Sequence, residues 1–226
     1  TVVRELSESP LSLAFGPSGD LFFTTDQGNL WRLSGNSLEK LNPTGYQVKG
    51  VEPVEDGTFE AKENPYDLDF LEEGQYAGDM IVSLAGPSSG TGRVVRLPAP
   101  EYDKVLSFID SFQEVDSDGN MRTKGLETPT GLAVSRTGDV FVCSFASSEL
   151  YILCYSQVGE FMEIFTRNIS RPNSLEVDWH QRVYATTASF QGGEAISGSL
   201  RRYNSQAAQM DIISKFGTWG IAICEE

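Results

Sequence analysis

Short hydrophobic runs alternate with polar turns along the whole chain, and none of them keeps the 3.6-residue period of an amphipathic helix. The clearest example is the segment 129–142, in which a proline begins one hydrophobic run and a Gly-Asp pair precedes a second run. The same pattern stands at 10–23, looser copies begin at Pro65 and Pro172, and a last copy begins at Thr218. Each copy is typical of two β-strands joined by a tight turn.

Two further hydrophobic runs follow each of the first four copies, which predicts four units of four short strands. The predicted strands are 11–15, 20–25, 29–33 and 38–41; 66–71, 79–84, 92–97 and 105–109; 131–134, 139–145, 150–154 and 161–165; 174–177, 182–187, 198–203 and 210–216. Two polar stretches, 43–64 and 112–127, interrupt the series, and we predict that both are exposed inserted loops.

The last three copies follow one another at about 45 residues, and four strands in each period are the signature of a β-propeller blade. We therefore predict an all-β propeller in which residues 1–226 form a single domain with four complete antiparallel blades. The segment Gly220–Cys224 fits the first strand of a fifth blade, and Thr1–Leu6 fits the last strand of a blade. Because two strands of that blade are missing, either the fifth blade is partial or the chain belongs to a longer five- or six-bladed propeller.

The charge of the chain narrows the class of partner. Seventeen Lys and Arg residues stand against 32 Asp and Glu residues, which gives a formal net charge of −15. Such a surface repels phosphate backbones, so we predict no nucleic-acid partner; a cation or a basic protein is favoured, although solubility alone also explains the charge. No hydrophobic run is long enough for a membrane span. The chain starts at Thr1 without a visible signal peptide, so trimming of a precursor or an arbitrary boundary explains the start, and we expect a secreted, periplasmic or organelle-lumenal protein.

Three cysteines are too few for a disulfide framework. If Ser148 and Glu149 form a two-residue hairpin turn, Cys143 and Cys154 lie directly opposite each other on adjacent strands and are a disulfide candidate. Two buried free thiols are an equally good interpretation, and Cys224 is left without a partner.

The phrase Pro-x-Gly-Leu-Ala-Val-x-x-x-Gly-Asp-Val-Phe-Val at 129–142 resembles the repeats of NHL propellers. It equally resembles the six-bladed gluconolactonase, strictosidine synthase and sorbosone dehydrogenase-like families. The segments 76–84 and 92–97 look most like the sorbosone dehydrogenase-like group. The resemblance implies the propeller architecture, but it says little about activity, because repeat positions serve packing and turns.

For a gluconolactonase-like enzyme, the resemblance implies Asn or acidic ligands for a divalent cation at the position after each repeat proline. That position holds Leu11, Tyr66, Thr130, Asn173 and Trp219. Only Asn173 keeps the expected type, and Glu8 is the other oxygen side chain near the ring. Calcium needs six or more oxygen ligands, so these residues favour a ligand-binding mouth over a catalytic metal. The aromatic side chains suit a peptide, a sugar or an apolar ligand, or they plug a narrow channel.

A second candidate metal site lies in the insertion 112–127. Its oxygen side chains alternate as in the start of an EF-hand-like calcium loop, at Glu114, Asp116, Asp118 and Asn120. The pattern departs from that loop at Arg122 and Gly125. The alternative is an ordinary acidic turn, which we favour because Asp-Gly and Gly-Asn are common turn pairs.

The sequence therefore predicts a non-enzymatic scaffold that engages a protein or a small ligand through the channel mouth and the inserted loops. The alternative is a calcium-dependent lactonase or hydrolase of the gluconolactonase type, with Glu8, Asn173 and an unassigned Asp as ligands. Calcium is the only cofactor that the residues suggest. The single histidine, His180, falls at a predicted turn, which disfavours a quinone-dependent dehydrogenase, a His-rich metal site and a Ser-His-Asp triad.

Overall fold

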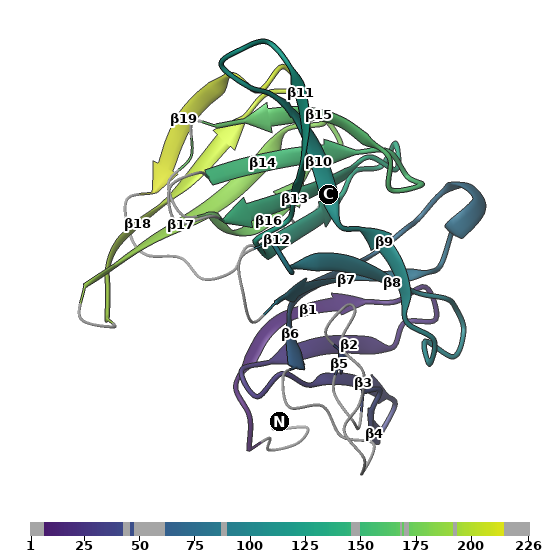
Figure 1. Cartoon of the computed structure of the whole chain (residues 1–226). Coiled ribbons are helices and arrows are strands. Elements are labelled where there is room, and N and C mark those ends of the chain that lie inside the picture. The colour runs from purple at the N-terminus through teal and green to yellow at the C-terminus, as the bar shows by residue number, and fades with distance from the viewer. Residues whose placement is uncertain are drawn as a thin grey trace.

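Four antiparallel sheets follow one another along the chain as the blades of a β-propeller (Figure 1). The computed structural model describes residues 7–42, 46–47, 62–86, 90–145, 150–167, 169, 172–191 and 194–214. Blade 1 lies at the bottom of Figure 1, blade 2 lies above it, and blades 3 and 4 form the upper part. The predicted all-β propeller with four-stranded antiparallel blades is confirmed.

The strands have the following bounds. Blade 1 consists of β1 (Pro10–Phe15), β2 (Leu21–Thr25), β3 (Leu30–Ser34) and β4 (Ser37–Lys40). Blade 2 consists of β6 (Lys62–Phe70), β7 (Met80–Ala85), β8 (Arg93–Leu97) and β9 (Leu106–Ile109), with the short strand β5 (Tyr46–Gln47) paired to β6. Blade 3 consists of β12 (Thr128–Val134), β13 (Val140–Phe145), β14 (Leu150–Tyr155) and β15 (Phe161–Thr166). Blade 4 consists of β16 (Pro172–Val177), β17 (Val183–Gln191), β18 (Glu194–Tyr203) and β19 (Gln209–Ser214). One 3-10 helix, η1 (Gly74–Tyr76), connects β6 to β7.

The insertion 112–127, which was predicted as an exposed inserted loop, forms a β-hairpin. Its strands are β10 (Ser111–Val115) and β11 (Met121–Gly125). The polar residues that suggested a loop pair across the exposed part of the hairpin, as Glu114 does with Arg122. Phe112 and Leu126 are buried in the core between blades 2 and 3, so a few hydrophobic anchors decide the structure of this polar stretch. Most of the insertion 43–64 and both predicted terminal strands lie outside the described residues.

The repeat proline marks a bulge at the start of every innermost strand. The register of each such strand shifts directly after Pro10, Pro65, Pro129 or Pro172. A bulge leaves residues out of the ladder and re-aims their side chains. The position after the proline is therefore turned away from the regular pleat, which explains why it varies while its neighbours repeat.

The Gly-Asp pair of the repeat supplies a tight turn. In blade 3, Gly138 N–H donates to the carbonyl of Ser135 at 2.8 Å, and Ser135 N–H donates to the carbonyl of Asp139 at 2.8 Å. Gly138 has a φ of 87°, a conformation that glycine adopts without a steric penalty. Blade 4 makes the same turn although its copy of the repeat lacks the glycine, because Gln181 takes the left-handed conformation at a φ of 61°.

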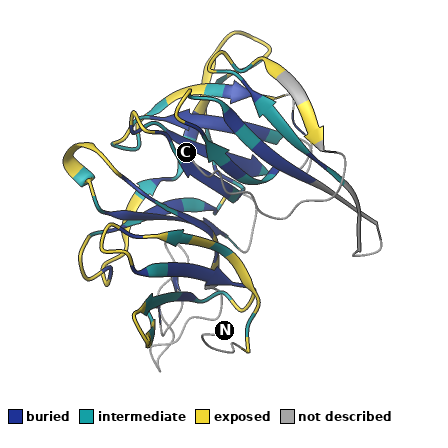
Figure 2. Ribbon diagram, turned by 180° about the vertical axis from the view of Figure 1, so that it is seen from behind, coloured by how far each residue is buried: buried dark blue, intermediate teal, exposed yellow. Residues whose placement is uncertain are grey.

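One hydrophobic cluster lies between each pair of neighbouring blades. The burial pattern is visible in Figure 2, where dark blue strands lie inside the blades and yellow marks turns and the exposed parts of outer strands. Between blades 1 and 2, the Phe22 ring lies 5.2 Å from the Phe70 ring and 5.1 Å from the Tyr102 ring, edge to face in both cases. Truncating such a ring typically costs about 3–5 kcal/mol, so blade stacking depends on residues of this kind.

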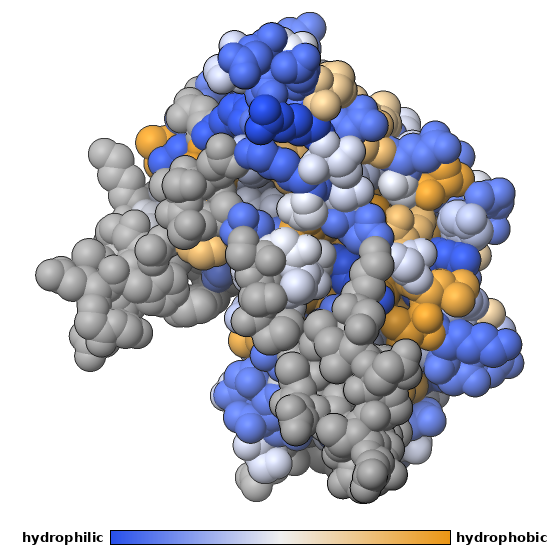
Figure 3. Space-filling view, in the orientation of Figure 1, coloured by the Kyte–Doolittle hydropathy of each residue, from blue (hydrophilic) through white to orange (hydrophobic). Residues whose placement is uncertain are grey.

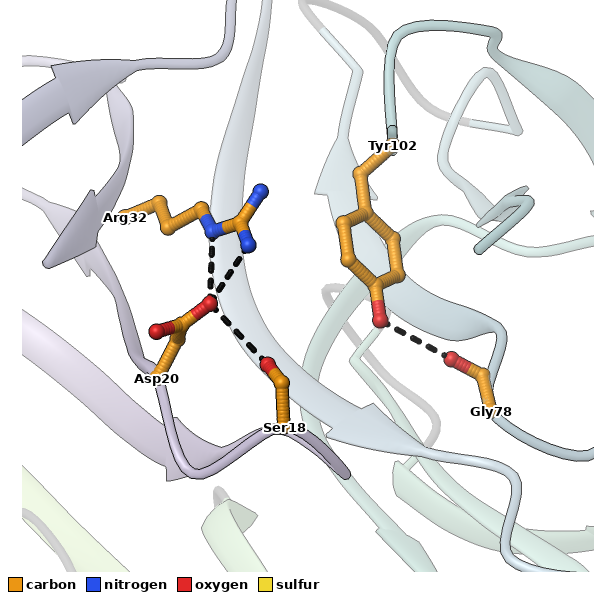
Figure 4. A network of polar contacts seen from close by, with 5 residues as sticks. All are labelled: Ser18, Asp20, Arg32, Gly78 and Tyr102. Atoms are coloured by element: carbon orange, nitrogen blue, oxygen red, sulfur yellow. Dashed lines mark hydrogen bonds and ion pairs between the residues drawn. The ribbon is translucent and has the colours of Figure 1, made fainter. Parts of the chain in front are cut away.

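A polar network borders the same contact between blades 1 and 2 (Figure 4). The Asp20 carboxylate accepts hydrogen bonds from Arg32 Nε at 2.9 Å and from Ser18 Oγ at 2.9 Å. The Arg32 guanidinium lies 5.7 Å from the centre of the Phe22 ring. On the blade 2 side, Tyr102 Oη donates to the carbonyl of Gly78 at 3.1 Å. Both polar groups therefore lie at the margin of the aromatic cluster.

The predicted pairing of Cys143 with Cys154 is wrong. Phe145 pairs with Leu150, so four residues separate β13 from β14 instead of two, and the register moves by two positions. Cys143 therefore faces Ile152, and both cysteines are buried free thiols. Burial raises the pKa of Cys154 to about 12, which keeps the thiol protonated.

Where the residues are described, the face seen in Figure 3 is mostly hydrophilic, with hydrophobic residues gathered in a few groups. Within the described part of the chain, no helix has both the length and the hydrophobicity that crossing a membrane requires.

Candidate functional site

The innermost strands of the four blades converge on a cavity of about 510 Å³. Strands β1, β6, β12 and β16 contribute all of its lining residues. Neighbouring innermost strands approach closely: a Cβ on Gly131 would lie 3.0 Å from the Cα of Ser174, closer than an ordinary van der Waals contact. The cavity is therefore placed by the repeat itself, at the common centre of the blades.

Asp67 is a buried carboxylate on the wall of this cavity, with 7% of its surface exposed. Its Oδ1 accepts hydrogen bonds from Ser12 Oγ and from Leu68 N–H, the latter at 3.0 Å. Its Oδ2 accepts from Leu132 N–H at 3.0 Å. Burial raises the pKa of Asp67 to about 6, although these hydrogen bonds oppose the shift. One side chain of β6 thereby links the innermost strands of blades 1, 2 and 3.

Asp69 lies two residues further along β6 on the wall of the same cavity, where it is half-buried. Its Oδ2 accepts from Val134 N–H at 2.7 Å, and its Oδ1 accepts from Phe70 N–H at 2.8 Å. Burial raises the pKa of Asp69 to about 7, and repulsion from Asp67 adds to the shift. A carboxylate has about four acceptor sites, so two N–H donors leave capacity for a water molecule or a ligand.

The predicted mouth residues Leu11, Tyr66, Thr130 and Asn173 all line this cavity, so the structure brings four of the five positions together. Leu11 and Tyr66 are 41% and 37% exposed. Thr130 Oγ1 donates to the carbonyl of Pro172 at 2.9 Å and thereby joins blades 3 and 4. Trp219 lies outside the described residues.

Glu8 does not line the cavity with Asn173. Its carboxylate accepts hydrogen bonds from Thr25 Oγ1 at 2.6 Å, Asn29 Nδ2 at 2.8 Å and Trp31 Nε1 at 3.1 Å. These hydrogen bonds lower the pKa of Glu8 although burial opposes them. Glu8 therefore fastens the segment before β1 to blade 1.

The EF-hand-like segment forms the tip of the β10–β11 hairpin. Asp116 Oδ1 accepts from Asp118 N–H and from Asn120 N–H, both at 2.9 Å, as in the repeat turns. Asp116 also pairs with Arg122 at 2.5 Å. Glu114 lies 2.6 Å from Lys124 and 2.5 Å from Arg167. The Glu114 and Asp116 side chains, which were expected to help hold an ion, are instead bound to amides and cations of the hairpin and to Arg167 of blade 3.

The described residues do not fit a calcium site of the kind that the resemblance implied. Asp67 already accepts three hydrogen bonds, and Glu8 is held by three donors at another place. Over the described ranges, no three His, Cys, Asp or Glu side chains are grouped so that they could hold a metal ion. Calcium prefers six or more oxygen ligands, which these committed carboxylates do not supply.

Asp67 and Asp69 are the site residues that we did not identify from the sequence. The signal was present in the repeat, because Asp69 occupies the position that Ala14 and Ala133 hold in blades 1 and 3. A charged residue on an innermost strand is unusual for a packing position and indicates a functional or bridging role.

Comparison with known proteins places the fold. No family model and no curated protein matches the sequence. Among solved structures, a gluconolactonase from Xanthomonas campestris aligns with a TM-score of 0.59 at 14% identity, over 96% of this chain and 66% of that one. A glucose dehydrogenase aligns with a TM-score of 0.54 at 14% identity, over 96% of this chain and 72% of that one. TolB from Acinetobacter baumannii aligns with a TM-score of 0.53 at 14% identity, over 96% and 46%.

The likeness is one of fold. The neighbours include propellers of the gluconolactonase and sugar dehydrogenase kind, which agrees with the resemblance in the repeats. The chain spans slightly less than two thirds of the length of the Xanthomonas enzyme.

Proposed function

We propose that the chain hydrolyses a small ester of the sugar-lactone type in the central cavity, with Asp69 as the general base. The observation that carries the proposal is the raised pKa of Asp69, about 7, in a carboxylate that borders a cavity of about 510 Å³. A general base is most effective when its pKa lies near the working pH. The likeness of fold to a gluconolactonase supports the choice of substrate class.

The proposed reaction needs water as its only second reactant. Ionised Asp69 takes a proton from a water molecule while the water oxygen bonds to the carbonyl carbon of the lactone. The bond from that carbon to the ring oxygen then breaks, and the ring oxygen receives the proton from Asp69, which gives the hydroxy acid. The Asn173 amide borders the same cavity and is our candidate donor to the carbonyl oxygen as it gains negative charge.

Asp67 has a different role in this proposal. Its hydrogen bonds to Ser12, Leu68 and Leu132 hold the cavity walls together, and its charge helps to keep the pKa of Asp69 high. It is therefore a positioning residue, and no step of the reaction passes through a metal ion.

Hydrolysis of a panel of aldonolactones tests the proposal. We expect Asp69→Asn to lower kcat/KM by about 100-fold or more, the usual contribution of a general base. Asp118→Asn, at the exposed hairpin tip, is the matched control and should behave as the wild type. Wild-type turnover in Asp69→Asn would refute the proposed base.

Ligand binding without turnover is the second candidate function, and the exposed Leu11 and Tyr66 side chains on the cavity wall favour it. Such side chains suit the apolar face of a sugar or a peptide. If the protein only binds its ligand, calorimetry should detect saturable binding of the same lactones without hydrolysis. Tyr66→Ala should then weaken this binding.

A further inference from the structure

Ser12 lies on the wall of the central cavity, at the end of the bulge that begins at Pro10, and it is half-buried. Its Oγ donates a hydrogen bond to Asp67 Oδ1. A serine hydroxyl is a weak nucleophile until a neighbouring base accepts its proton. The hydrogen bond therefore holds this hydroxyl beside a group that can activate it, and the proposed hydrolysis gives the hydroxyl no chemical role.

Asp67 has the two properties that such a base needs. In an activated serine a third group orients the base, and here Leu132 N–H donates to Asp67 Oδ2 at 3.0 Å while Oδ1 accepts from Ser12. Burial raises the pKa of Asp67 to about 6, which makes its carboxylate a stronger base than that of an ordinary aspartate. Most of it is still ionised at neutral pH and can accept a proton.

Two other serines show that each feature of Ser12 also occurs without the other. Ser174 occupies the same repeat position in blade 4 and lines the same cavity, but its hydrogen bond runs from its N–H to Thr186 Oγ1 at 3.1 Å. Ser18 donates to the Asp20 carboxylate at 2.9 Å, but it lies at an exposed turn and not on the cavity wall. Within the described residues, Ser12 is the serine that combines a carboxylate partner with a place on this wall.

We propose that Ser12 is a nucleophile that accepts the acyl group of an activated ester, with Asp67 as its general base. The bond from Ser12 Oγ to the carbonyl carbon forms while Asp67 takes the hydroxyl proton. The bond from that carbon to the ester oxygen then breaks, and the leaving group departs with the electron pair as a phenolate-type anion. The acyl group stays on Ser12, and the proton passes from Asp67 to water. The cavity of about 510 Å³ has room for a small acyl group.

This reaction is separate from the proposed lactone hydrolysis. The hydrolysis uses water and Asp69, with Asp67 as a positioning residue, whereas the acyl transfer uses Ser12 and Asp67. The two proposals therefore fail independently. Lactone turnover by a protein whose Ser12 is never modified would refute the acyl transfer alone, and modification of Ser12 without lactone turnover would refute the hydrolysis alone.

Incubation with a fluorophosphonate, followed by mass spectrometry of the intact protein and of its peptides, tests the proposal. The probe offers an electrophilic phosphorus in place of the carbonyl carbon: the Oγ–P bond forms, fluoride leaves, and Asp67 takes the proton. We expect one phosphonyl group per chain, on Ser12 and not on Ser174. Ser12→Ala should abolish this labelling. Ser18→Ala, which removes the serine–carboxylate pair outside the cavity, is the matched control and should be labelled as the wild type is.

An ester substrate tests the acyl transfer itself. The wild type should release p-nitrophenolate from p-nitrophenyl acetate, which is followed by absorbance, and prior labelling with the fluorophosphonate should abolish the release. Release that survives complete labelling of Ser12 would overturn the proposal, as would a folded wild type that takes up no phosphonyl group or takes it up on Ser174.

The role of Asp67 is tested by substitution. Asp67→Asn keeps an acceptor for the Ser12 hydroxyl but cannot take its proton, so it should slow labelling by about 100-fold or more. Melting temperatures establish that the variant is folded, since the change also touches the buried hydrogen bond from Leu132. Labelling of folded Asp67→Asn at the wild-type rate would overturn the proposal.

The pH dependence of labelling in the wild type tests the same role without a substitution. The rate should rise by about tenfold from about pH 5 to about pH 7, with a midpoint near 6, as Asp67 ionises. Among the described residues, the other titratable groups near Asp67 are Asp69, Glu176 on the β16 wall and the Cys143 thiol. Asp69 has a pKa of about 7, and burial keeps the pKa of Cys143 well above its ordinary value, so a midpoint near 6 reports Asp67. A rate that does not change over this range would overturn the proposal.

Discussion

Asp67 and Asp69 make the stability of this protein fall as the pH rises through the neutral range. Each has a pKa in the folded chain, about 6 and about 7, above the ordinary value of 3.8. At a pH between 3.8 and the raised pKa, each of these carboxyl groups has released its proton in the unfolded chain but still holds it in the folded chain. Raising the pH therefore favours the unfolded chain, and the stability contributed by the protonated carboxyl groups is lost by about pH 7.

The magnitude follows from the shifts. For each pH unit above about pH 5, a protonated carboxyl group loses about 1.4 kcal/mol of its stabilisation until the pH reaches its raised pKa. The loss extends over about two pH units for Asp69 and about one for Asp67. The free energy of unfolding should thus fall by about 4 kcal/mol, a large part of the stability of an ordinary domain. The carboxyl groups with lowered pKa values, Glu8, Asp20, Glu114 and Asp178, act in the opposite direction, but their stabilisation is lost only as the pH falls through the acid range below about pH 4.5.

Urea unfolding followed by tryptophan fluorescence measures this dependence at a series of pH values. Asp69→Asn should remove about two thirds of the decline in unfolding free energy, because Asp69 accounts for about two thirds of the total. Asp118→Asn, at an exposed hairpin tip, should keep the whole decline. An unfolding free energy that is flat or rises over this range, or a full decline in Asp69→Asn, would refute the reasoning.

Three further predictions concern the core, the thiols and the hairpin. Phe22→Ala removes a ring packed on Phe70 and Tyr102, and it should lower the unfolding free energy by about 3–5 kcal/mol in the same urea assay; a loss below about 1 kcal/mol would contradict the packing. In a Cys224→Ser background, Ellman's reagent should leave the buried Cys143 and Cys154 unmodified until urea unfolds the chain; rapid reaction of the native protein would contradict their burial. Asp116→Ala should cost about 1 kcal/mol through the lost turn hydrogen bonds, and neither calcium nor a chelator should change the melting temperature; a rise with calcium would restore the hypothesis of a metal loop.

The architecture could be predicted from the sequence because each local pattern agrees with the fold. A proline followed by two hydrophobic runs recurs four times among the described blades, and a Gly-Asp turn like Gly138-Asp139 recurs in three of them, so the period and the strand count were both visible. The hairpin at 112–127 was missed, because only its two anchors, Phe112 and Leu126, reveal that a polar stretch packs on the core. Such an anchor acts through tertiary contacts that no local pattern contains.

The candidate site could be predicted only in part. The position after each proline indicated which residues surround the channel, and four of them line the cavity. The environment of Asp67 and Asp69 depends on N–H groups of β12, about 65 residues away in the chain, so their raised pKa values follow only from the stacking of blades. The register of Cys143 failed for a related reason, since the length of one loop decides which residues face each other.

Titration of the Asp69 carboxyl group by carbon-13 NMR, in protein labelled at aspartate and assigned with Asp69→Asn, tests the central claim most directly. The account predicts a midpoint near pH 7 and a change in this resonance when an aldonolactone or its hydroxy acid is added. A midpoint near 3.8, the ordinary value for aspartate, together with a resonance that no such ligand disturbs, would contradict it.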